Sequence, residues 1–132
     1  MRRVNWHQYL AQTLQAAMTR PFSWGEHDCC LFAADCVQAM TGTDPAAEFR
    51  GTYRTAVGAK KAILARAVSL PALIDEVLPR VDARLVQRGD VVLFDGPQGE
   101  MLGIVWHGAV WAVGARGAGP VEAEIKLAWR VE

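Results

Sequence analysis

The stretch that decides the fold reads Pro21-Phe22-Ser23-Trp24-Gly25-Glu26-His27-Asp28-Cys29-Cys30-Leu31-Phe32. Asp28 is of the residue type that caps helix N-termini, and apolar residues recur behind it at helical spacing as far as Met40. Thr41-Gly42 then supplies a glycine stop. The pattern predicts a helix that begins at Cys29, immediately after its cap, and whose apolar stripe, Cys29 included, faces inward.

The elements around this helix predict an α+β fold. Helical patterns cover residues 5–18, with Asn5 as the cap, then 55–67 and 69–78, while 43–53 reads as a loop. From residue 89 onward, short apolar or alternating runs predict strands over 90–94, 101–106, 109–113, 121–125 and 127–131. His107-Gly108 reads as a two-residue hairpin turn. Residues 114–119 are glycine-rich, but no strand-to-helix context follows them, so we do not expect a phosphate-binding loop there. We therefore expect one α+β domain over 1–132, with a helical part at about 4–80 and an antiparallel β-meander at about 89–131.

Composition excludes several function classes. Lys+Arg and Asp+Glu are both 14, so the neutral chain lacks the basic footprint of a nucleic-acid binder. The sequence shows neither an apolar signal core nor a membrane-length apolar run, so we expect synthesis in the cytoplasm and no membrane insertion. The three cysteines are expected to be thiols. The spacing within residues 27–30 lacks the repeats of zinc sites, and we expect neither a metal nor a cofactor.

Cys29 is the candidate nucleophile. A helix N-terminus presents unpaired N–H groups and a partial positive charge, and both favour thiolate over thiol. The alternative is a buried structural cysteine, a common core residue. Cys30 and Cys36 are expected to be core or surface filler.

Three motifs together resemble the NlpC-type papain-like cysteine peptidases. Trp24-Gly25 with Asp28-Cys29 is similar to their aspartate–cysteine segment, residues 89–94 resemble their glycine–aspartate strand, and Met101-Leu102-Gly103-Ile104-Val105 resembles their histidine-bearing strand. The resemblance implies a papain-like fold, in which N-terminal helices pack on a small antiparallel sheet or half-barrel, with Cys29 in the place of the nucleophile.

A closer resemblance covers nearly the whole chain. The same patches, together with Tyr53-Arg54-Thr55 and Ala128-Trp129-Arg130-Val131, are similar to small papain-like proteins encoded in phage and prophage tail-gene clusters. This resemblance implies a place in a virion tail, with other tail proteins of the hub or tip as partners.

The catalytic base of the resembled peptidases has no counterpart. A cysteine peptidase needs an imidazole within reach of the sulfur and a third group to orient the ring. Met101 stands where the family has its histidine, and residues 110–113 offer no orienting polar group. His107 and His27 remain as alternative bases. A role in the hairpin turn explains His107 without catalysis. His27, two residues before Cys29 in the loop that enters the helix, would approach the sulfur in an unfamiliar arrangement.

Two functional hypotheses follow. In one, a peptidase-like domain has lost catalysis and serves as a tail tip or baseplate component or as a tail assembly protein. In the other, Cys29, assisted by His107 or His27, cleaves stem peptides of peptidoglycan during phage entry. An unrelated binding module, such as an immunity or regulatory protein, is a third alternative.

Overall fold

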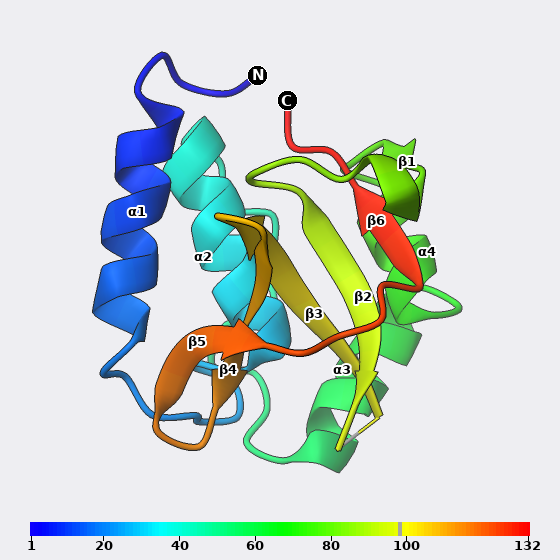
Figure 1. The fold of residues 1–132 in the computed structure, drawn as a ribbon. Coiled ribbons are helices and arrows are strands. Elements are labelled where there is room, and N and C mark those ends of the chain that lie inside the picture. Colours follow the sequence, from blue (N-terminus) through cyan, green and yellow to red (C-terminus); the bar gives the residue numbers. More distant parts are fainter. Residues whose placement is uncertain (98) are drawn as a thin grey trace.

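A computed structural model describes residues 1–97 and 99–132 and has the expected α+β architecture (Figure 1). Its helices come first in the chain and are α1 (Trp6–Ala17), α2 (Cys29–Thr41), α3 (Ala56–Arg66) and α4 (Leu70–Asp75). The predicted start of α2 is confirmed, since Asp28 caps it and Gly42 ends it in the left-handed conformation. A short 3-10 turn, η1 (Ala83–Leu85), precedes the main strands.

The strands form a six-stranded sheet in the order β1-β6-β2-β3-β4-β5, in which every neighbouring pair is antiparallel. Their bounds are β1 (Arg80–Val81), β2 (Val91–Gly96), β3 (Gly99–Trp106), β4 (Ala109–Gly114), β5 (Gly117–Val121) and β6 (Leu127–Trp129). Strands β2 to β5 form the predicted meander, but β6 does not continue it. It returns instead to the free edge of β2 and is itself covered by β1.

Both faces of the sheet are covered. Between the sheet and helices α1 and α2 lies the larger apolar cluster, with Leu10, Phe32 and Trp129 at its centre, each fully buried. A smaller cluster on the other face is built from alternate strand residues such as Val92 and Val110. The β5–β6 connection crosses this second face in Figure 1 and supplies part of its cover.

The predicted strand over 121–125 is wrong. The strand that pairs with β4 is Gly117–Val121, which begins inside the glycine-rich stretch 114–119. Glycine-rich backbone can still fill a ladder, because pairing requires backbone groups rather than side chains. The alternation of apolar and acidic residues that suggested a strand does correspond to alternating burial. Ala123 and Ile125 pack against the sheet, while Glu122 and Glu124 are exposed. An extended crossing segment satisfies one-sided burial without strand pairing.

Other boundaries shift at element ends. The helix expected over 69–78 ends at Asp75, and Asn5 precedes α1 without a side-chain cap hydrogen bond. Strand β1, at residues 80–81, was not predicted, because two residues carry too little pattern to be recognised.

Candidate functional site

Cys29 occupies the first position of α2, and its cap is unusually well held. The buried carboxylate of Asp28 accepts hydrogen bonds from the backbone N–H of Leu31 at 3.0 Å and of Gly25 at 3.0 Å. It also accepts one from the phenolic hydroxyl of Tyr53 at 2.6 Å. These contacts fix the loop before α2 and thereby the direction in which the helix presents its first residue.

Tyr53 is a site residue that reasoning from the sequence did not assign a role. Its hydroxyl reaches Asp28 across 25 positions of the chain, and burial together with this hydrogen bond raises the pKa of Tyr53 far above its usual value. The available signal was the place of Tyr53-Arg54-Thr55, beside the aspartate–cysteine segment, among the patches that carry the resemblance to tail-cluster proteins. Gly25 also holds this arrangement in place. Its φ is +81°, and an added Cβ would overlap the carbonyl oxygen of Tyr53, so the position requires glycine.

The Cys29 thiol faces the sheet and is acidified. A hydrogen bond with the Cys30 thiol is the largest contribution that lowers the pKa of Cys29; burial opposes it, and a backbone hydrogen bond from Leu102 of β3 adds to the lowering. The two sulfur atoms lie 3.9 Å apart, and both thiols are free. The pKa of Cys30 is raised in turn, through its hydrogen bond to Cys29 and its burial. Of the two thiols, it is Cys29 at the helix start whose pKa is lowered.

His27 lies on another side of α2. Its ring meets Phe32 edge to face at 6.1 Å, and burial, followed by the charge of Arg20, lowers its pKa. It is 1% exposed, and neither ring nitrogen has a hydrogen-bond partner among the described residues. His27 lines a surface hollow together with Thr13 and Ala17 of α1, whereas the contact with Leu102 places Cys29 against β3. The structure does not bring the two side chains together by any hydrogen bond.

His107 occupies the hairpin turn between β3 and β4. Its φ of 49° and the positive φ of Gly108 give the two-residue turn predicted from the sequence. The exposed ring stacks on Trp106 at 4.5 Å between centroids. Leu102 is the residue of β3 that contacts Cys29. It precedes His107 by five residues, which corresponds to about 16 Å along the strand. The turn thus holds His107 far from the Cys29 sulfur.

Met101 neighbours Leu102 on β3. It packs with the second apolar cluster, whereas Leu102 belongs to the first, as expected for successive residues of a strand. A Cβ added at Gly96, two residues along β2 from Phe94, the strand partner of Met101, would overlap the Met101 sulfur. Met101 is therefore a packing residue of the far face of the sheet.

The glycine–aspartate motif has a structural role. The buried carboxylate of Asp90 accepts hydrogen bonds from Arg130 at 3.0 Å and from the backbone N–H of Gln87 at 2.8 Å. In the same terminal patch, the indole N–H of Trp129 donates to Asp75 at 2.8 Å. The segments at 89–90 and 128–131 are therefore joined in the fold.

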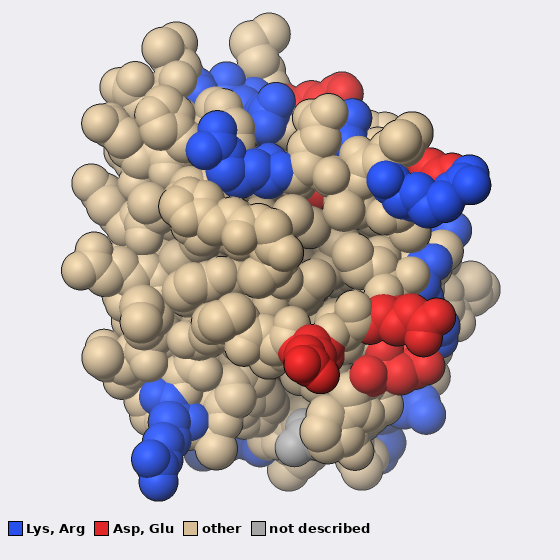
Figure 2. Space-filling view, in the orientation of Figure 1, with Lys and Arg blue, Asp and Glu red and all other residues tan. Residues whose placement is uncertain are grey.

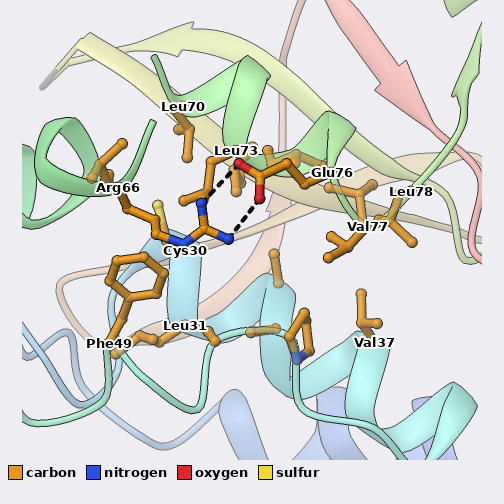
Figure 3. Close-up of a pocket in the computed structure, with 18 of the residues that line it drawn as sticks. Cys30, Leu31, Val37, Phe49, Arg66, Leu70, Leu73, Glu76, Val77 and Leu78 are labelled. Carbon is orange, nitrogen blue, oxygen red and sulfur yellow. Dashed lines mark hydrogen bonds and ion pairs between the residues drawn. The ribbon is translucent and has the colours of Figure 1, made fainter. Parts of the chain in front are cut away.

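An apolar cavity lies beside Cys30. It has a volume of about 120 Å³, is partly open to solvent, and is lined by residues of α2, α3, α4, the loop before α3 and strands β2 and β3 (Figure 3). Leu31, Leu73 and Val77 are typical of its lining, and the Arg66–Glu76 ion pair runs along one side, with N–O distances of 2.6 and 3.1 Å. An apolar cavity of this size accommodates a small hydrocarbon group better than water.

Within the described parts of the chain, no group of three metal-ligating side chains comes together. Over the same residues, none of the helices combines the length and apolar character needed to cross a bilayer.

The chain belongs to the family described as domain of unknown function DUF6950, whose model matches residues 1–131. No curated protein matches the sequence.

Proposed function

We propose that this chain is a non-catalytic component of a phage tail, at the tip or baseplate, or a tail assembly protein, built on a papain-like scaffold of the NlpC type. The observation that carries the proposal is the environment of Cys29. Its thiol is poised by a helix N-terminus, yet its hydrogen-bond neighbours are Cys30 and the backbone of Leu102 rather than an imidazole.

The roles of the shared motif residues support the loss of catalysis. In a cysteine peptidase, an imidazole takes the thiol proton and returns it to the leaving amine. Here Met101, at the position of the family histidine, packs on the far face of the sheet, and His107 is held in a distant turn. Asp28 and Asp90 have their oxygen atoms engaged in holding loops and the C-terminal strand. The motif therefore stabilises the scaffold without assembling proton-transfer machinery.

The likeness to tail-cluster proteins supports the place of action. It implies other tail proteins of the hub or tip as partners and the virion tail as the final location, after synthesis in the host cytoplasm. The neutral charge of the chain is compatible with this role, since it leaves little electrostatic repulsion against partner subunits.

The experiment that tests this proposal is a genetic complementation combined with an enzymatic assay. In a phage or prophage that carries the gene, we expect deletion to abolish infectious particles and Cys29→Ala to restore them fully. Purified wild-type protein should leave a peptidoglycan gel intact. The proposal fails if wild type clears the gel and Cys29→Ala does not, or if particles form and infect without the gene.

The second candidate is a cysteine peptidase or amidase that acts on peptidoglycan stem peptides. The lowered pKa of Cys29 is the observation that favours it. The thiolate would attack an amide carbonyl to form a thioester, the amine would leave with a proton from an imidazole, and water would then hydrolyse the thioester. Backbone N–H groups at the start of α2 would stabilise the oxyanion.

Alkylation kinetics separate the two candidates. On the non-catalytic proposal, the pH midpoint of Cys29 alkylation rises in Cys30→Ala, which removes the hydrogen bond to the thiolate, and stays unchanged in His27→Ala and His107→Ala. A peptidase predicts that one histidine variant shifts this midpoint and slows the reaction at pH 6. Intact-mass measurement after timed labelling, in a Cys36→Ser background where folding permits, gives the rate for each variant.

A further inference from the structure

Five side chains from three separate segments form a continuous stacked surface, which we call the arginine–tryptophan surface. The guanidinium of Arg2 lies 4.4 Å from the ring centroid of Trp6. That of Arg88 lies 5.5 Å from both Trp6 and Trp106, and Trp106 stacks on His107 at 4.5 Å. The surface thus joins the chain start and α1 to the loop before β2 and to the β3–β4 turn.

The cations of this surface are not neutralised within the described part of the chain. No ion pair there includes Arg2 or Arg88, nor the neighbouring Arg3, which lies over Tyr9. A guanidinium placed over the face of an aromatic ring keeps N–H donors that a carboxylate can bind, and Arg2 and Arg88 have no such partner among the described residues. Tryptophan and arginine are also the residues most enriched at energetically important interface positions.

Carboxylates gather on another part of the molecule, which we call the acidic surface. It consists of Asp95, Glu100, Glu122 and Glu124, and the nearby cation is Lys126, at 3.3 Å from Asp95 and 3.7 Å from Glu100. Figure 2 shows red side chains grouped at the lower right of the face and blue ones grouped in its upper part, where some red side chains also lie beside them. The chain is neutral as a whole, and many of its charges are paired with each other, but no ion pair among the described residues includes Arg2 or Arg88 on one surface, or Glu122 or Glu124 on the other.

The two surfaces lie toward opposite ends of the sheet. Glu100 is near the start of β3 and Trp106 is its last residue, so six residues, or about 20 Å, separate them along the strand. A contact between the arginine–tryptophan surface of one copy and the acidic surface of another therefore joins two different patches. Such a heterologous contact repeats from copy to copy, and it closes into a ring or extends as a filament.

We propose that this chain self-associates head to tail, with the arginine–tryptophan surface of each copy seated on the acidic surface of the next. The inference goes beyond the proposed function and does not depend on it, because it stands on the placement of charges and aromatic rings alone. Since the attraction is between exposed charges, the association weakens as salt is added.

Sedimentation velocity of the purified protein over a series of concentrations tests the proposal. We expect the wild type to form species larger than a monomer at low salt and to dissociate at high salt. Arg88→Glu gives one surface the charge of the other, and so does the double variant Glu122→Arg, Glu124→Arg; each of these proteins should remain monomeric. All three positions are exposed, so neither change removes a buried contact.

Mixing the two monomeric variants tests directly whether the two surfaces bind each other. The unchanged acidic surface of Arg88→Glu fits the unchanged arginine–tryptophan surface of the double variant, and the two reversed surfaces attract each other, so association should return. Arg116→Glu is the matched control. It makes the same charge change at an exposed position in the β4–β5 turn, at the opposite end of β4 from His107, and should associate as wild type does.

Two results overturn the proposal. One is a wild type that stays monomeric at low salt up to about 1 mM, where even an association of only about −4 kcal/mol is half formed. The other is association that survives each charge reversal or fails to return on mixing, because the contact then lies elsewhere on the molecule.

Discussion

Replacing Tyr53 with phenylalanine tests the hydrogen bond to Asp28 that holds the start of α2. The change removes only the hydroxyl, which donates to the Asp28 carboxylate at 2.6 Å, and leaves the bonds from the backbone of Gly25 and Leu31 in place. A hydrogen bond to a carboxylate in a buried site contributes about 2 kcal/mol. We therefore expect Tyr53→Phe to lower the free energy of unfolding by about 2 kcal/mol.

Urea denaturation followed by tryptophan fluorescence measures the effect. For a slope of roughly 2 kcal/mol per molar urea, the midpoint should fall by about 1 M with the slope unchanged. Tyr9→Phe is the matched control, because Tyr9 is 41% exposed and its hydroxyl has no hydrogen bond within the described residues. Its midpoint should equal that of wild type.

A double-mutant cycle with Asp28→Ala makes the test specific. If the hydroxyl stabilises the fold through the carboxylate, Tyr53→Phe should cost little once Asp28 is gone, and the coupling energy should be about 2 kcal/mol. A Tyr53→Phe variant within about 0.5 kcal/mol of wild type, or a cycle without coupling, would refute the reasoning.

Three further predictions concern the same framework. Gly25→Ala should lower the free energy of unfolding by about 3 kcal/mol, because the added methyl group meets the Tyr53 carbonyl and φ is positive. Gly51→Ala is the control and should cost about 1 kcal/mol, because φ is positive there but the space is open. Equal losses of the two variants in thermal melts would contradict the clash. Arg130→Met should lower the free energy of unfolding by about 3 kcal/mol, because it leaves the buried Asp90 carboxylate without its cation. Adding Asp90→Asn should recover part of this loss. A loss under about 1 kcal/mol in urea denaturation would show that the ion pair is dispensable. The pKa of Tyr53 is raised on folding, so its contribution to stability is complete below its unfolded pKa of 10.0 and is lost as pH rises above that value. Wild type should therefore lose stability in alkali more steeply than Tyr53→Phe. Parallel profiles of stability against pH for the two proteins would contradict this.

Local patterns in the sequence determined the elements whose signals are local. Asp28 and Gly42 marked both ends of α2 because a cap and a left-handed glycine act on the nearest backbone groups. His107-Gly108 marked its turn because a two-residue hairpin requires positive φ at both positions. The α+β order followed from the change of hydrophobic period near residue 89.

Tertiary structure decided which residues meet. Nothing local distinguishes the paired strand at 117–121 from the crossing segment at 122–126, because ladder pairing depends on the partner that the fold supplies. Likewise, only packing joined Tyr53 to Asp28 and Arg130 to Asp90, and it placed His27 in a hollow beside α1 while Cys29 lies against β3. A sequence shows that a thiol and an imidazole are present, but the distance between them is set by the whole chain, since burial and long-range contacts fix side-chain directions that no neighbouring residue controls.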